Sequence, residues 1–333
     1  KNPLDPERTC GGSSGGSAAY IAATTIARAS LAESTGGSIS CPAAFCAVTG
    51  LTPTYGLVSR YGLIDYANSL DKIGTLGKSV KDAAALLTTI AGHDPKDATS
   101  LMHEKENYSA YAIQQPKKVK IGVIKEYMES ADVQIRKAVW SGIEKLEGNH
   151  ITYEEVSLDM PYAIPTYYIL AMAEASTNLA RYCGLRYGQE RIPSTGFNEY
   201  FSSIRKEGFG KEAKRRIILG TFVRMAGWRN AYYLKALKIR KKMILKFKKL
   251  FATYPILAAP TMPFLPPKIK EINKLTPVEQ YSADILTVAP NLAGIPMLSV
   301  PIKEKTPMGL HLMADHLQEK KIIQLGAYYE SIR

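Results

Sequence analysis

The 333-residue chain has little of what marks several common protein classes, with only four cysteines, five histidines and two tryptophans. Four cysteines in so long a chain do not form a disulfide framework, so we expect free thiols in a reducing cytoplasm. No apolar run approaches the roughly 18 residues of a membrane span, and no signal-peptide pattern is present. We therefore expect a cytoplasmic protein without a membrane partner.

The histidines are scattered, and they form neither an HExxH pattern nor a Cys/His ligand spacing. Cys41 and Cys46 enclose the apolar segment Pro-Ala-Ala-Phe, which is typical of a core. We therefore expect no metal site. A Ser-His-Asp triad could form only if distant residues met in the fold.

Two glycine–serine clusters, at residues 11–17 and 34–38, lie close together in the sequence. Such a cluster is most often a flexible linker, and the first one carries no phosphate-loop ending. However, the alanine-rich segment 18–29 between them predicts a buried helix rather than a solvated linker. Glycine permits close backbone approach, which a site needs to direct N–H groups at a developing negative charge. With serines as candidate nucleophiles, the spacing indicates a serine site that is not a GxSxG elbow.

The net charge of +13 is concentrated in one segment. Residues 200–251 hold 16 lysines and arginines against two glutamates, which is +14 and leaves about −1 for the rest of the chain. Within it, residues 230–251 predict an amphipathic helix with a basic face. That face could simply be solvated, could contact the phosphates of a nucleic acid, or, less readily, could lie on a membrane surface.

Helical patterns alternate with short apolar strands along the rest of the sequence. Expected strands are residues 119–124, 151–156, 255–260, 297–300 and 309–313, and expected helices are residues 79–92, 132–146, 162–182, 230–251 and 319–330. Residues 184–210 are expected to be mainly loop. The alternation predicts an α/β fold with a mixed, largely buried central sheet, and 333 residues can form one large domain or two.

The serine clusters resemble the amidase signature family, whose segment reads GGSSGG, a hydrophobic helix, then DTGGSIR and later FCG and GLKPT. This chain has GGSSGGS at 11–17, STGGSISCPAAFC at 34–46 and GLTPTYG at 50–56. Further segments resemble the tRNA-dependent amidotransferase branch: VSRYGL (58–63), SLDKIG (69–74), AGHDPKD (91–97), AEASTNLARY (173–182), RRIILGTF (215–222), DILT (284–287) and NLAGIP (291–296). The resemblance covers essentially the whole chain. It implies the amidase-signature fold, an α/β fold with a mixed central sheet covered by helices on both faces, in a single domain over residues 1–333.

The resemblance implies a catalytic role for both clusters. Ser38 would be the nucleophile that becomes acylated, and Ser13 would be the cis-peptide serine that relays its proton. The backbone N–H groups of Thr35, Gly36, Gly37 and Ser38 would form the oxyanion hole, where each donor is typically worth about 10²–10³ in rate.

The same resemblance implies a pocket for glutamine. Arg216 would pair with the α-carboxylate, a task that suits a guanidinium fork, or else it would be an ordinary member of the basic segment. Asp284 would receive the α-ammonium. Tyr168, or its neighbour Tyr167, would line the pocket.

The sequence departs from the family pattern in three places. The family's catalytic lysine precedes GGSSGG on a strand and Lys1 does not match it, so the resemblance implies that the N-terminal part of the domain is missing. Ser34 and Ser40 stand where the family has an aspartate and an arginine. The interval between the two reacting serines is one residue longer, which leaves Ser14 as an alternative relay.

The implied activity is hydrolysis of glutamine to release ammonia. A partner B subunit, using ATP and magnesium, would then amidate misacylated Glu-tRNA(Gln) or Asp-tRNA(Asn), with a small C subunit stabilising the pair. No cofactor is expected in this chain itself. The alternatives are a stand-alone amidase acting on another small amide and a non-catalytic interaction protein.

Overall fold

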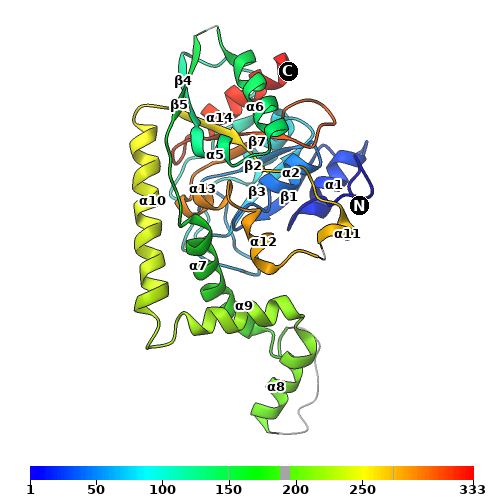
Figure 1. Cartoon of the computed structure of the whole chain (residues 1–333), viewed down its shortest axis with the longest axis vertical. Coiled ribbons are helices and arrows are strands. Elements are labelled where there is room, and N and C mark those ends of the chain that lie inside the picture. The colour runs from blue at the N-terminus through cyan, green and yellow to red at the C-terminus, as the bar shows by residue number, and fades with distance from the viewer. Residues whose placement is uncertain (149, 188–195, 273) are drawn as a thin grey trace.

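The computed structural model describes residues 1–148, 150–187, 196–272 and 274–333. Figure 1 shows a central sheet with helices around it and a helical arm that extends away from it. The strands are β1 (Ala29–Ser34), β2 (Thr49–Thr52), β3 (Lys72–Gly77), β4 (Val119–Ile124), β5 (Ile151–Val156), β6 (Ile256–Pro260), β7 (Met297–Pro301) and β8 (Gly309–Met313).

The helices lie between these strands along the chain. They are α1 (Gly15–Ala23), α2 (Ser40–Phe45), α3 (Val80–Ile90), α4 (Tyr108–Tyr111), α5 (Lys125–Glu129), α6 (Val133–Leu146), α7 (Ala163–Asn178), the 3-10 turn η1 (Leu179–Arg181), α8 (Phe197–Gly208), α9 (Lys211–Phe222), the π turn η2 (Asn230–Leu234), α10 (Lys235–Phe251), α11 (Ile269–Ile272), α12 (Pro277–Ser282), α13 (Val288–Ala293) and α14 (Glu319–Ile332).

The eight strands form one mixed sheet in the order β1-β3-β2-β7-β8-β6-β4-β5. Neighbours from β1 to β6 are antiparallel, whereas β4 runs parallel to both β6 and β5. The predicted mixed sheet is therefore confirmed, and so are the five strands expected from the sequence.

Helices cover both faces of the sheet. Successive side chains of a strand point to opposite faces, so neighbouring residues of one strand belong to different cores. In β7 and β8, Leu298 and Leu312 join a core with α3, α6 and α14. Their neighbours Met297 and Met313 join a second core with α7, α10 and α13. Strands buried on both faces show no polar alternation, which explains their continuous apolar sequences.

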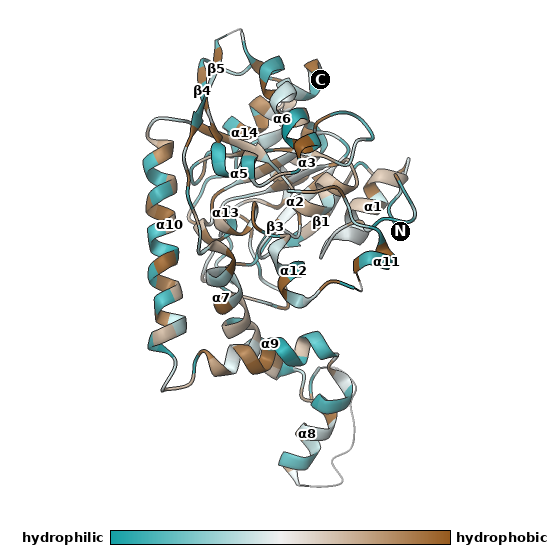
Figure 2. Cartoon of the chain, viewed as in Figure 1, coloured by the Kyte–Doolittle hydropathy of each residue, from teal (hydrophilic) through white to brown (hydrophobic). Residues whose placement is uncertain are grey.

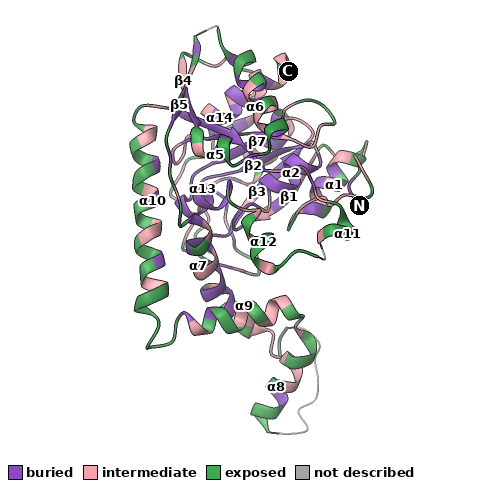
Figure 3. Ribbon diagram, in the orientation of Figure 1, coloured by how far each residue is buried: buried purple, intermediate pink, exposed green. Residues whose placement is uncertain are grey.

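Figure 3 shows that α8 and the outward face of α10 are mostly exposed and that α9 mixes exposed and half-buried residues, while the sheet is buried. Figure 2 shows hydrophilic and hydrophobic residues mixed along α10, as expected for an amphipathic helix. The predicted helix over residues 230–251 is confirmed, beginning with the π turn η2.

Two predictions about local structure are wrong. The expected helix over residues 18–29 ends at Ala23, and Ala29 already begins β1, which pairs with β3. That pairing overrides the helix propensity of the alanines. Within 184–210, α8 is a helix whose apolar residues follow the i, i+3, i+4, i+7 pattern that the prediction overlooked; residues 188–195 of this segment lie outside the described part.

A buried amine and a buried imidazole lie close enough within the sheet region to influence each other. The Nζ atom of Lys72 donates to the carbonyl oxygen of Ile295 at 3.1 Å. Burial lowers the pKa of Lys72 to about 7, against the attraction of Glu319. Burial and the nearby Lys72 lower the pKa of His311 to about 3. This cluster therefore adds a pH-dependent cost to folding.

Lys72→Met is expected to raise the free energy of unfolding more at pH 7 than at pH 10. The unfolded chain keeps the lysine proton up to its ordinary pKa of 10.5, so the burial cost is fully present below pH 7 and fades as pH rises toward 10.5. Urea denaturation at both pH values measures the difference. Lys81→Met, at an exposed position of α3, is the control, and an equal gain at both pH values for Lys72→Met contradicts the prediction.

Candidate active site

The second serine cluster forms a tight connection between β1 and α2. Gly36 and Gly37 are buried, whereas Ser38 is partly exposed. In the described part of the chain, no main-chain carbonyl accepts the N–H groups of Thr35, Gly36, Gly37 or Ser38. Buried main-chain N–H groups almost always have an acceptor, so this row can receive an anionic atom that arrives with a ligand.

Both glycines are required by close packing. A Cβ atom on Gly36 would lie 2.6 Å from the ring atom Cζ of Tyr167 in α7, and one on Gly37 would overlap the hydroxyl of Thr287. Any other residue would push the loop away from these two side chains. The loop therefore has a fixed position between α7 and the start of α13.

Asn291 of α13 also fixes the loop. Its Nδ2 group donates to the carbonyl oxygen of Gly36. In a planar trans peptide the C=O and the following N–H point in opposite directions, so this bond turns the Gly37 N–H away from Asn291. Sequence reasoning missed this role, although Asn291 begins the NLAGIP segment that carried part of the resemblance.

Two carboxyl groups support the loop at Thr35. The Thr35 hydroxyl lies 3.0 Å from both Oε1 of Glu33 and Oδ1 of Asp71. Asp71 also accepts main-chain N–H groups from residues 66 and 67. Burial raises the pKa of Asp71 to about 6, and burial together with Asp71 raises the pKa of Glu33 to about 7. These two acids were not among the predicted site residues.

The first serine cluster lies against the second. The peptide bond between Gly12 and Ser13 is cis, the geometry that the resemblance implies. The Ser14 N–H donates to the Ser38 carbonyl at 3.2 Å. The Ser14 hydroxyl donates to the Glu33 carbonyl at 3.0 Å and accepts the Glu33 N–H at 3.3 Å. Ser14 is thus engaged with β1, whereas Ser13 is exposed.

The structure brings Tyr168 and Asp284 together. The Tyr168 hydroxyl donates to Oδ2 of Asp284 at 2.6 Å, and its ring stacks on Tyr281 with centroids 4.1 Å apart. Burial raises the pKa of Asp284, while the Tyr168 hydrogen bond and Arg216 oppose the rise. Tyr281 was not predicted as a site residue.

Arg216 of α9 faces the same aromatic stack. Its Nε donates to Oε1 of Glu212 at 2.8 Å and its Nη1 donates to the Tyr66 hydroxyl at 2.7 Å. The guanidinium carbon lies 5.5 Å from the ring centroid of Tyr66 and 6.0 Å from that of Tyr281. Arg216 is therefore held against these tyrosines rather than solvated with the rest of the basic segment.

This cluster of tyrosines, Arg216 and Asp284 adjoins the row of unpaired amides. Tyr167, which packs on the first glycine of the loop, contacts the ring of Tyr168 edge-on with centroids 4.9 Å apart. Thr287, which packs on the second glycine, donates its N–H to the carbonyl of Asp284 at 3.0 Å. All the predicted site residues thus belong to one continuous region.

The described residues contain no group of three or more histidine, cysteine, aspartate or glutamate side chains that could hold a metal ion. No helix in this part of the chain has the length and apolar character needed to cross a bilayer. All four cysteines are unpaired.

Ser34 and Ser40, which replace the family's aspartate and arginine, flank the loop. Both side chains are buried, and neither hydroxyl has a hydrogen-bond partner among the described residues. Burying a hydroxyl without a partner costs about 1–3 kcal/mol. These two hydroxyls therefore contribute nothing to holding the loop.

Ser34→Ala and Ser40→Ala are each expected to leave the free energy of unfolding unchanged or to raise it by about 1 kcal/mol. Chemical denaturation measures the change. Thr75→Val is the comparison, because the buried Thr75 hydroxyl does donate to the Ala83 carbonyl at 2.9 Å. Its removal should therefore lower the free energy of unfolding. A loss of stability in the serine variants as large as that of Thr75→Val contradicts the assignment.

Comparison with known proteins agrees with this geometry. The family model described as Amidase matches residues 1–323. The glutamyl-tRNA(Gln) amidotransferase A subunit of Halothermothrix orenii is 46% identical over 328 residues, covering 97% of this chain and 68% of that protein. The A subunit of the same enzyme from Carboxydothermus hydrogenoformans is 47% identical over 335 residues, covering 99% and 68%.

A crystal structure of the corresponding A subunit from Thermotoga maritima has a TM-score of 0.78 at 35% identity, covering 97% of this chain and 66% of that chain. The chain thus spans about two thirds of the length of the relatives it matches. The family and the fold that the serine motifs predict are confirmed: the chain belongs to the amidase family.

Proposed function

We propose that the chain is the glutaminase subunit of a tRNA-dependent amidotransferase. One observation carries the proposal: a row of main-chain N–H groups without acceptors among the described residues adjoins a side-chain cluster that holds both a guanidinium and a carboxylate. The N–H groups suit the oxyanion formed when an amide is attacked. The two opposite charges suit a substrate that carries both an α-carboxylate and an α-ammonium, as glutamine does.

The pocket leaves one atom of each charged group available. Tyr168 occupies Oδ2 of Asp284, so Oδ1 can accept from the ammonium. Glu212 and Tyr66 occupy Nε and Nη1 of Arg216, so Nη2 can donate to the carboxylate. Charge-assisted hydrogen bonds at both ends would orient the amide of the substrate toward the loop.

The proposed reaction uses Ser38 as the nucleophile. Ser13 relays a proton: its oxygen accepts the Ser38 hydroxyl proton as the Ser38 oxygen attacks the amide carbon, and its own hydroxyl proton passes to the amide nitrogen. The resulting oxyanion accepts the N–H groups of Thr35, Gly36, Gly37 and Ser38. The C–N bond then breaks, the protonated nitrogen leaves as ammonia, and water hydrolyses the glutamyl ester to restore the serine.

The ammonia would serve a partner. In this proposal a B subunit uses ATP and magnesium to activate misacylated Glu-tRNA(Gln) or Asp-tRNA(Asn), and a C subunit stabilises the pair. This chain needs no cofactor for its own step. The reaction places the protein in the cytoplasm, where aminoacyl-tRNA is made. The close relatives named as amidotransferase A subunits support the proposal.

Arg216→Lys and Asp284→Asn are expected to raise KM for glutamine about 10–100-fold with a smaller fall in kcat. Each change weakens a contact to the α-amino acid group without touching the attacked carbon. Ammonia release is measured with glutamine and with propionamide, which lacks both charges, for the chain alone and with the B and C subunits. The KM for propionamide should not change.

Ser38→Ala is the matched control, because it should abolish release from both amides. Equal effects of Arg216→Lys and Asp284→Asn on both substrates would contradict a glutamine pocket. Rapid, partner-independent hydrolysis of aryl or fatty amides would favour a stand-alone amidase instead.

A further inference from the structure

The outward side of α10 carries a row of lysines that the glutaminase reaction does not use. All seven lysines of α10 are exposed, and the helix contains no aspartate or glutamate. Five of them recur every three or four residues and so lie along one side of the helix: Lys235, Lys238, Lys242, Lys246 and Lys249. At 1.5 Å per residue this row is about 21 Å long.

A merely solvated helix would not need this arrangement. Like charges three or four residues apart repel each other by about 0.2–0.5 kcal/mol per pair, and Lys242 has such neighbours on both sides in Lys238 and Lys246. The lysine–carboxylate pairs found among the described residues involve lysines outside α10. The repulsion is thus uncompensated within this part of the protein, and a polyanion would relieve it.

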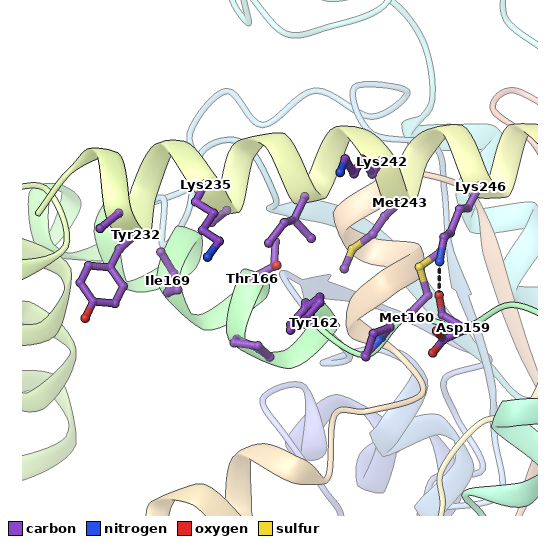
Figure 4. A pocket seen from close by; sticks show the side chains of 15 residues that line it. Asp159, Met160, Tyr162, Thr166, Ile169, Tyr232, Lys235, Lys242, Met243 and Lys246 are labelled. Atoms are coloured by element: carbon purple, nitrogen blue, oxygen red, sulfur yellow. Dashed lines mark hydrogen bonds between the residues drawn. The ribbon is translucent and has the colours of Figure 1, made fainter.

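A groove of about 570 Å³ runs beside the row, between α10 and the start of α7. Lys235, Lys242 and Lys246 follow one side of it, and Tyr162 and Met160 lie on the other (Figure 4). Its one acidic lining residue is Asp159, whose main-chain carbonyl accepts from Lys246 at 2.5 Å.

Aromatic rings are exposed at the same place. Tyr162 is 61% exposed, Tyr232 is 37% exposed and Trp228 is 46% exposed. The rings of Tyr232 and Trp228 lie 6.0 Å apart, at the end of the groove near Lys235. A lysine row beside accessible aromatic rings is typical of surfaces that hold a nucleic-acid backbone while bases stack on the rings.

The helix is a rigid platform rather than a membrane anchor. Ala236, Met243 and Phe247 are buried in the core, and the two exposed leucines, Leu237 and Leu245, stand among exposed lysines, so they form no continuous apolar face that could enter a bilayer. Arg240 ties α10 to the body by donating to the carbonyl of Leu292 at 2.7 Å and to the hydroxyl and carbonyl of Ser69 at 2.8 Å.

We propose that the lysine row of α10, together with Tyr162, Trp228 and Tyr232, binds the sugar–phosphate backbone of RNA. The charge of the row complements phosphate, its length matches several consecutive phosphates, and the rings supply stacking partners. This surface goes beyond the glutaminase reaction, because it needs only this chain and an RNA. It lies on the far side of α7 from the row of amides, so both can be occupied at once.

The test is fluorescence anisotropy of a fluorescein-labelled tRNA transcript titrated with the chain at several KCl concentrations. Four or five phosphate contacts predict a slope of log K against log salt of about −3 to −4.5, which is a loss of roughly 10²-fold between about 50 and 200 mM. Lys238→Glu combined with Lys242→Glu should weaken binding at least tenfold and make the slope shallower by about 2.

Two further variants separate the contributions. Tyr232→Ala should weaken binding about tenfold without changing the salt slope, because stacking releases no counterions. Lys137→Glu combined with Lys145→Glu on α6 makes the same change in net charge at exposed positions away from α10, and it should leave affinity within about twofold. Circular dichroism of each variant checks folding.

An equal loss in the α6 and α10 pairs would overturn the proposal, since binding would then follow net charge alone. So would unchanged tRNA affinity of the α10 pair, or binding of polyglutamate but not tRNA, which would point to an acidic protein partner. Glutamine binding is measured in parallel by calorimetry. If the unsubstituted chain does not bind glutamine, that result counts against the glutaminase site and not against the RNA surface.

Discussion

The site depends on a row of consecutive main-chain amides, at residues 35–38, that have no main-chain acceptor in the described part of the fold. Such groups are costly when buried, so the surrounding structure must prevent the loop from collapsing onto a carbonyl. Close packing of Gly36 on Tyr167 and of Gly37 on Thr287 does this. The hydrogen bond from Asn291 to the Gly36 carbonyl sets the orientation of the peptide between the two glycines.

The same contacts link the amides to the pocket. Tyr167 and Tyr168 are neighbours on α7, and one packs on the loop while the other bonds to Asp284. A change in the pocket is therefore transmitted to the loop through a single turn of helix. The family's usual aspartate and arginine are not needed for this, because two buried serines, which have no hydrogen-bond partner among the residues described, stand in their places.

The sequence predicted the sheet type and the catalytic candidates because those features are local. Apolar runs such as Val119–Ile124 and motifs such as the serine clusters can be read directly from the chain. The pairing of β1 with β3, the acids around Thr35 and the role of Asn291 depend on contacts between distant residues, and no periodicity reports them. Tyr66 and Tyr281, which hold Arg216 and the stack, were missed for the same reason.

The most direct test of the central claim is a crystal structure of the chain after reaction with a glutamine-derived electrophile. The account predicts a covalent bond to the Ser38 oxygen, with the oxygen of the former carbonyl within about 2.7–3.1 Å of at least two N–H groups from residues 35–38. An adduct on Ser14, or an adduct oxygen that faces solvent with those amides pointing elsewhere, would contradict it.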